Sequence, residues 1–137
     1  MHIDGTDLIL GRVASFAAKQ ALLGENVIIT NCEKIIISGT RKHNIARYLE
    51  IYEMGNPMNG PFLPRVADRF VKRVCKRMLP HKRARGREAL KRIRCYVGSP
   101  KVDEKPITLP KANYKKLPTL KITKLSDLCN TIGGKRY

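Results

Sequence analysis

The sequence contains few aromatic and few acidic residues. Aromatic side chains make up 6% of the 137 residues and tryptophan is absent, so any core must pack mainly through aliphatic side chains. Asp and Glu together number 11 against 28 Lys and Arg, which leaves a net charge of +17. A chain with this balance repels itself unless a polyanion neutralises it, and nucleic acid is therefore the expected partner.

Long apolar stretches are also missing. No apolar run exceeds three residues, and Asp4, Asp7, Arg12 and Lys19 interrupt any apolar core near the start. A membrane span needs about 20 consecutive apolar residues, and a signal peptide needs a shorter uninterrupted run. We therefore expect a soluble, cytoplasmic protein without a signal peptide and with no membrane partner.

The third absence concerns ligand motifs. The four cysteines include no C-x-x-C pair, and the three histidines and eleven acids form no H-E-x-x-H motif or closely spaced carboxylate cluster. Zinc and other metal sites normally begin from such spacings. We expect no metal, no cofactor and no small-molecule substrate, and we interpret the cysteines as buried or reduced thiols.

The charge that is present lies mostly in one half of the chain. Residues 1–54 hold six basic and six acidic side chains, and residues 55–64 hold none. Residues 65–94 hold 13 basic and two acidic side chains, whereas residues 95–137 hold nine and three. This asymmetry indicates a dedicated nucleic-acid contact rather than charge spread for solubility.

The neutral half predicts an α/β unit. Residues 12–23 carry apolar side chains at helical spacing, and Gly24 supplies a stop. Residues 26–30 and 34–37 are continuous β-branched runs, typical of strands that are covered on both faces. A short strand at 7–10 and a helix at 40–54 complete the unit. The fold class is therefore a three-layer α/β/α core with a small, mostly parallel sheet.

The basic half predicts two docked helices after a Gly- and Pro-rich loop at 55–61. Within residues 68–79, apolar side chains form one stripe, and Lys and Arg fill the other side. Pro80 ends this helix, and a second helix follows over 86–94. We expect one domain over 1–99 that includes these helices. Residues 100–137 should form a Lys- and Pro-rich extended arm with a short helix near 126–131.

The candidate RNA-binding residues are the cations of this basic helical segment. Arg outnumbers Lys there by nine to four, which favours bidentate phosphate contacts. The plainer interpretation is a solvated basic face, but the local charge excess argues against it. The predicted site comprises Arg65, Arg69, Lys72, Arg73, Lys76, Arg77, His81, Lys82, Arg83, Arg85, Arg87, Lys91, Arg92 and Arg94.

Three other features suggest chemistry more weakly. His81 beside Lys82 could serve as a general base in RNA cleavage, but no second histidine or carboxylate lies nearby in the sequence to orient it. Residues 5–12 resemble a phosphate loop but lack G-K-[ST], so a turn and strand explain them better. Gly39 after Ser38 could place a helix N-terminus against an anion, although a cap that serves only the fold explains it somewhat better. We predict no catalytic residue.

Several motifs occur together and in a fixed order: DLILGRVAS at 7–15, VIITNCEKIIISG at 27–39, RMLPHK at 77–82 and Arg85-Gly86. Over residues 4–99 this string resembles the thirteenth universal family of large-subunit ribosomal proteins, and MLPHK resembles its archaeal and eukaryotic branch. The resemblance implies a non-catalytic α/β/α protein on the large subunit that contacts ribosomal RNA through Arg65–Arg94 and has ribosomal proteins as neighbours. The alternatives are an RNA-processing enzyme, a free-standing RNA-binding protein and a DNA-compacting protein.

Overall fold

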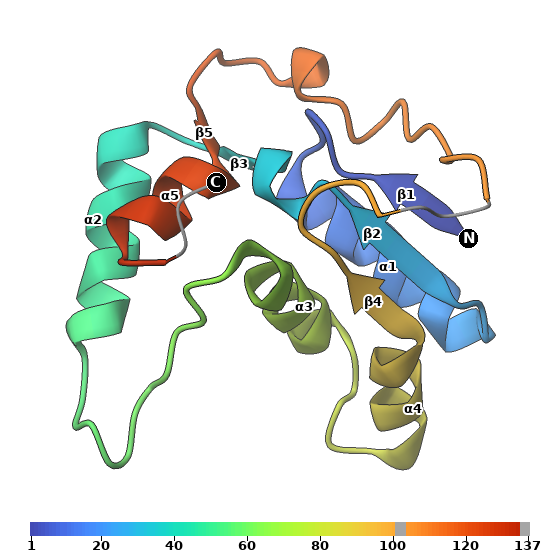
Figure 1. The fold of residues 1–137 in the computed structure, drawn as a ribbon, viewed down its shortest axis with the longest axis horizontal. Coiled ribbons are helices and arrows are strands. Elements are labelled where there is room, and N and C mark those ends of the chain that lie inside the picture. The colour runs from blue at the N-terminus through green and yellow to red at the C-terminus, as the bar shows by residue number, and fades with distance from the viewer. Residues whose placement is uncertain (101–103, 135–137) are drawn as a thin grey trace.

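The computed structural model describes residues 1–100 and 104–134; Lys101 and the basic end Lys135-Arg136 lie outside the described residues. The central sheet has three parallel strands in the order β1 (His2–Asp4), β2 (Val27–Thr30) and β4 (Ile93–Cys95) (Figure 1). The predicted α/β class with a small, mostly parallel sheet is thus confirmed.

Helix α1 (Leu10–Leu23) connects β1 to β2 and covers one face of the sheet. Its buried side chains include Val13, Ala17 and Ala21, all inaccessible to solvent. The two alanines let the helix axis approach the sheet closely. The helix ends at Gly24, whose positive φ of 108° is the left-handed conformation that glycine adopts without strain.

The first strand lies earlier in the chain than the sequence predicted. A strand was expected at 7–10, but the structure places β1 at His2–Asp4 and begins α1 at Leu10. Leu8 and Ile9 form only isolated bridges, because Asp7 has a φ of 58° that turns the chain away from β1. The buried Leu8 and Ile9 side chains serve the core from a turn instead.

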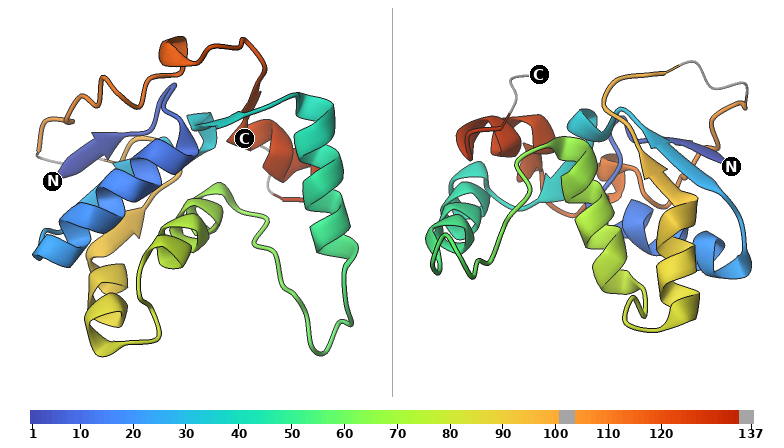
Figure 2. Two further views of the ribbon diagram at one scale, coloured as in Figure 1. Left: turned by 180° about the vertical axis from the view of Figure 1, so that it is seen from behind. Right: turned by 60° about the horizontal axis from the view of Figure 1, so that its bottom comes forward.

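Helices α3 (Ala67–Met78) and α4 (Ala84–Arg92) lie on the same face of the sheet as α1, and both pack against α1 (Figure 2). The apolar stripe of α3 docks as predicted through Phe70, Val71 and Cys75, whereas Met78 remains 43% exposed. The helix predicted for 86–94 ends at Arg92. Ile93 opens β4 and pairs beside Val27, where its β-branched side chain is fully buried.

A second sheet joins distant parts of the chain. Strand β3 (Ile36–Ser38) pairs in antiparallel fashion with β5 (Ile122–Lys124), next to helices α2 (Arg41–Glu53) and α5 (Leu125–Thr131). The Asn44 side chain donates to the Thr123 hydroxyl at 3.0 Å and ties α2 to β5. Single-turn 3-10 helices occur at η1 (Cys32–Lys34) and η2 (Tyr114–Lys116).

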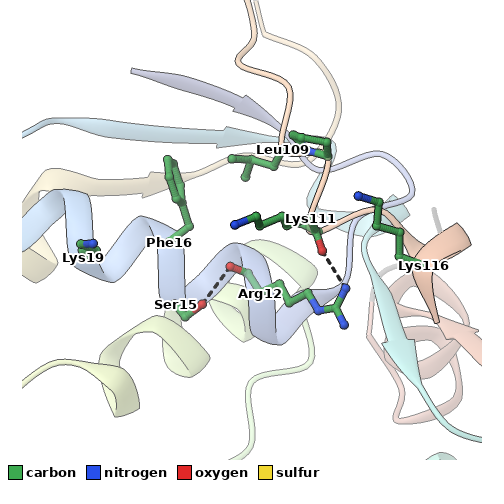
Figure 3. A pocket seen from close by; sticks show the side chains of 9 residues that line it. Arg12, Ser15, Phe16, Lys19, Leu109, Lys111 and Lys116 are labelled. Carbon is green, nitrogen blue, oxygen red and sulfur yellow. Dashed lines mark hydrogen bonds between the residues drawn. The ribbon is translucent and has the colours of Figure 1, made fainter. Parts of the chain in front are cut away.

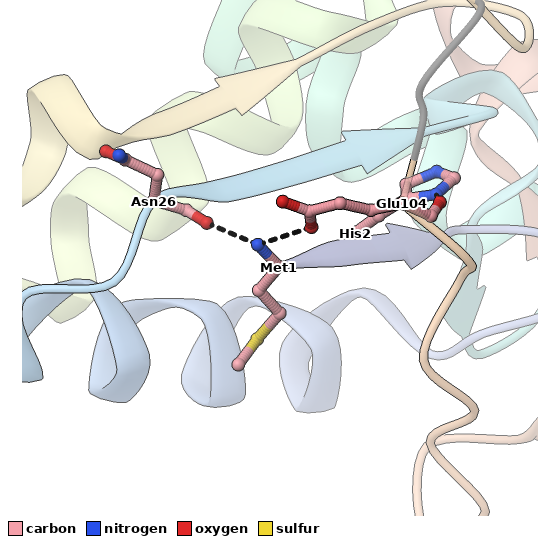
Figure 4. Close-up of polar contacts among 4 residues, drawn as sticks. All are labelled: Met1, His2, Asn26 and Glu104. Atoms are coloured by element: carbon pink, nitrogen blue, oxygen red, sulfur yellow. Dashed lines mark hydrogen bonds and ion pairs between the residues drawn. The ribbon is translucent and has the colours of Figure 1, made fainter.

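The layers are less regular than the predicted α/β/α sandwich. Ile3, Val27 and Ile29 face α1, α3 and α4, which share one side of the central sheet. His2 faces the other side, where its imidazole lies 2.9 Å from the Glu104 carbonyl oxygen (Figure 4). The Thr30 hydroxyl lies 2.9 Å from the same ring. A loop segment, rather than a helix, therefore contacts this face.

The prediction of an extended C-terminal arm is not confirmed for residues 104–134. The carbonyl of Ala112 accepts from the Ile9 amide at 2.8 Å, and the Leu125 amide donates to the Ile35 carbonyl at 2.8 Å. The Met1 ammonium forms an ion pair with Glu104 at 2.7 Å (Figure 4). The prolines prevent long helices and strands here, but they do not prevent packing.

Candidate nucleic-acid interface

Most of the predicted cations lie on the outer side of α3 and α4 and around the corner between these helices, whereas Arg65 precedes α3 and Arg94 lies in β4. Each helix buries an apolar face, so the side chains on the opposite face must point outward. None of the fourteen predicted side chains is buried. Four are half-buried, namely Lys72, Arg73, His81 and Arg92, and ten are exposed, namely Arg65, Arg69, Lys76, Arg77, Lys82, Arg83, Arg85, Arg87, Lys91 and Arg94.

These cations have no acidic partners among the described residues. Residues 1–100 and 104–134 contain a single ion pair, between the Met1 ammonium and Glu104. It lies far from α3 along the chain. Asp68 and Glu88, the two acids of the segment, form no ion pair with any described cation. The surface therefore keeps its full positive charge available to an external anion.

Three of the arginines are positioned by contacts with neighbouring segments. The Arg73 guanidinium donates to the Phe62 carbonyl, and that of Arg92 donates to the Ala21 carbonyl at 3.3 Å. The Arg65 guanidinium lies 4.5 Å from the centre of the Tyr52 ring, a cation–π contact. These contacts leave the charge unneutralised and reduce the entropy lost when the side chains bind an anion.

A tight corner sets the angle between α3 and α4. The Arg83 amide donates to the Pro80 carbonyl at 2.9 Å, and the Gly86 amide donates to the Arg83 carbonyl at 3.1 Å. Gly86 packs so closely that a Cβ there would overlap the Pro80 carbonyl oxygen. The Arg85-Gly86 pair of the sequence motif therefore combines an exposed cation with the only residue type that fits the corner.

A hollow of about 360 Å3 lies where α3 meets β4. It brings together Arg69 and Lys72 from the helix with Arg94 from the strand, and Tyr96 and one acidic residue, Asp68, line the same hollow. Residues from the beginning and the end of the predicted segment thus share one small concave site. An aromatic ring beside several cations suits contact with both phosphate and base.

His81 is half-buried at the corner. Its imidazole forms no hydrogen bond and no ion pair with a described residue, so nothing in residues 1–100 and 104–134 orients it as a general base requires. No group of three or more His, Cys, Asp or Glu side chains that could hold a metal occurs among the described residues.

The cysteines are free thiols. Cys32, Cys75 and Cys129 are buried and Cys95 is half-buried. Burial, together with the nearby Cys95, raises the pKa of Cys75 to about 12. A hydrogen bond with Cys32, followed by burial, raises the pKa of Cys95. All of these effects favour the neutral thiol, which neither binds metals nor attacks electrophiles well.

The sequence prediction missed a second group of cations. A groove of about 1010 Å3, here called the α1 groove, lies between α1 and the segment 109–116 (Figure 3). Its cationic side chains are Arg12, Lys19, Lys111 and Lys116, and its apolar side chains are Phe16, Leu109, Pro110 and Ala112. The two halves of the groove lie about a hundred residues apart in the chain, so no local charge count could have combined them.

The fold and these surfaces define a class: a small, strongly basic α/β protein whose apolar helix faces support an unneutralised cationic surface. Within the described residues, no helix has the length and apolar character that crossing a membrane requires. The family model for ribosomal protein L13 matches residues 1–102. The chain belongs to this family, which is one of ribosomal proteins and not of enzymes.

Curated relatives match over nearly the whole chain. The large ribosomal subunit protein uL13 of Methanosarcina barkeri is 43% identical over 136 residues, which cover 97% of each chain. That of Methanocaldococcus jannaschii is 39% identical with the same coverage, and that of Haloarcula marismortui is 38% identical over 98% of this chain and 91% of its own. The relatives therefore align beyond the family-model match and include the segment 104–134.

Proposed function

We propose that the chain is a structural constituent of the large ribosomal subunit that binds and stabilises large-subunit ribosomal RNA. Its relatives carry the name of a large-subunit protein, and it shares their length and family. The proposal assigns the main RNA contact to the surface formed by Arg65–Arg94, within a domain over 1–99, and supposes a supporting role in subunit assembly and translation in the cytoplasm.

The observation that carries the proposal is that the fourteen predicted side chains, nine of them on the two docked helices, form no ion pair with an acidic residue in the described part of the chain. Each phosphate that a cation neutralises releases counterions, and this release supplies much of the binding free energy. Docked helices also hold the cations at fixed spacings, which suits an RNA recognised by its shape and its 2′-hydroxyls. A flexible basic tail would meet the same phosphates at a larger entropy cost.

Neighbouring ribosomal proteins are the second class of partner in this proposal. The segment 54–62 is a reasonable point of contact because it carries no charge after Glu53 and exposes Met58 and Phe62. An RNA-facing surface would be expected to carry cations there. An uncharged, apolar loop is more typical of protein contacts.

Co-sedimentation tests the proposal. A tagged chain expressed in an archaeal host should sediment with large subunits and remain there through a wash at moderate salt. Crosslinks to RNA should map to α3 and α4. Recovery of the protein only in the free pool would overturn the ribosomal assignment.

A nuclease and a DNA-compacting protein predict different results. A nuclease using His81 should lose turnover by orders of magnitude in His81→Ala, whereas a scaffold should lose only some RNA affinity. A DNA-compacting protein should bind duplex DNA and ribosomal RNA equally in a competition experiment. The absence of an orienting contact to His81 among the described residues favours neither an acid–base role nor a metal-assisted one.

A further inference from the structure

The α1 groove has an apolar floor and a cationic rim. Figure 3 shows Phe16 and Leu109 facing each other across it, with Lys111 extending between the helix and the loop. Phe16 is half-buried, whereas Arg12, Lys19, Lys111 and Lys116 are all exposed. None of the described residues that line the groove is acidic. A ligand that fits it must therefore combine a flat or apolar part with negative charge on its flanks.

The groove is built, not incidental. The Arg12 guanidinium donates to the Lys111 carbonyl at 2.6 Å, and the Ile9 amide donates to the Ala112 carbonyl at 2.8 Å. Ala112 is buried between these contacts. The loop is thus fastened to the start of α1, and the floor and the rim keep their relative positions without a ligand.

The groove also continues toward the Arg65–Arg94 surface. A second hollow, of about 530 Å3, shares Ser15 and Lys19 with the α1 groove and extends to Met78 and Arg85. Lys19 therefore stands between the two cationic regions. A single polyanion strand could follow this path from Arg85 across α1 to Lys111.

We propose that the α1 groove binds an unpaired nucleotide of RNA, with the base over Phe16 and the flanking phosphates on Lys19, Lys111 and Lys116. This inference rests on the proposed function, because it supplies a second contact for the same RNA. Bases within a duplex are stacked and cannot reach a recessed apolar floor, whereas an unpaired base can stack on an aromatic ring. The occupant is therefore a single-stranded or bulged segment.

An acidic segment of another protein is the competing occupant. It would also match an apolar floor within a cationic rim. Continuity with Arg85 and the predicted RNA surface favours the nucleotide, because one strand then satisfies both regions. A protein segment in the α1 groove would instead have to end beside Arg85, where the RNA on the Arg65–Arg94 surface begins.

Binding of two probes to the full-length chain tests the proposal: a single-stranded oligouridylate and an RNA duplex of the same length. Phe16→Leu keeps apolar volume and removes the ring. It should weaken oligouridylate binding about tenfold, within the range for loss of one base–aromatic stack. Duplex binding should change little. Lys19→Ala with Lys111→Ala should also weaken oligouridylate binding about tenfold, and Arg12 is left intact because it fastens the loop.

The matched control removes two exposed cations from α2, Lys42→Ala with Arg47→Ala, and should leave oligouridylate affinity within about twofold of the parent. Urea midpoints confirm that each variant is folded.

Groove variants that behave like the control would overturn the inference while leaving the proposed function intact. Equal losses on both probes, or loss of binding to an acidic Glu/Leu peptide alone, would also overturn it. A parent chain that binds no RNA would overturn both proposals.

Discussion

Helices α1 and α3 pack against each other on the same face of the sheet but differ on their outer sides. Both are anchored by fully buried residues, such as Val13 in α1 and Val71 in α3. The outer side of α1 carries two cations, Arg12 and Lys19, whereas α3 carries five. The comparison shows that the inner faces determine the fold, so that the outer faces are free to carry binding charge.

The strongest test of this division between inner and outer faces is to place a charge on the inner face of α3. Val71→Asp puts a carboxylate at a position that solvent does not reach. We expect a loss of roughly 4 kcal/mol or more in the free energy of unfolding, enough to unfold most of the protein. Circular dichroism and urea titration measure this loss, and RNA binding should disappear with it.

The matched variant, Val74→Asp, lies one turn further along α3 at a half-buried position. It should cost less stability than Val71→Asp but still reduce RNA binding more than Lys72→Ala, which removes one cation and no packing. Equal effects of Val74→Asp and Lys72→Ala on binding would mean that the segment acts as a flexible basic tail.

The second prediction concerns the corner that joins the two basic helices. Gly86→Ala adds a methyl group that overlaps the Pro80 carbonyl oxygen, so α4 must move relative to α3. We expect a loss of about 2 kcal/mol in stability, typical of overpacking, together with weaker RNA binding. Gly11→Ala is the control, because a Cβ there meets no atom within 4 Å. Thermal unfolding of both variants distinguishes a steric effect from a general effect of losing glycine.

The two basic helices could be predicted because their signals are local. The apolar stripe, Pro80 and the charge run all lie within thirty residues, and the structure places the helices within a few residues of the predicted bounds. The end of the second helix was wrong because Ile93 enters the sheet, where pairing beside Val27 outweighs its helical neighbours. How the cations contact RNA stays a prediction.

The features that the sequence did not reveal depend on distant contacts. Strand β5 exists because Ile122–Lys124 pairs with Ile36–Ser38, some eighty residues earlier, and nothing local in a Pro-rich segment indicates it. Strand β1 has only three residues, too few to show the alternation of apolar and polar side chains that indicates a strand. The α1 groove likewise needs the fold to bring Lys111 to Arg12.

The third prediction uses pH to probe the inner face of α3. Because the pKa of Cys75 is raised to about 12 in the folded state, unfolding releases a proton from this thiol above pH 9. Its contribution to stability is complete below the unfolded pKa and is lost as pH rises toward the folded pKa. Between pH 7.5 and 10 the parent should lose about 1 kcal/mol more than Cys75→Ala, measured by urea titration. All other ionisable groups are the same in both proteins and cancel in the comparison. Equal losses would show that Cys75 ionises freely.

The last prediction leaves the fold intact and changes only the outer faces. Lys76→Ala, Lys82→Ala and Arg87→Ala together remove three exposed cations that form no ion pair with a described residue. Stability should change by less than about 0.5 kcal/mol, or rise slightly as repulsion falls. If each cation contacts one phosphate, the slope of log affinity against log salt should decrease by roughly 2, since each contact contributes about 0.7 to 0.9.

Fluorescence anisotropy at several salt concentrations gives the slope. The control triple on α2, Arg41→Ala, Lys42→Ala and Arg47→Ala, removes the same charge and should leave the slope nearly unchanged. If both triples lower the slope equally, binding depends on net charge alone, and the docked arrangement of α3 and α4 would have no special part in it.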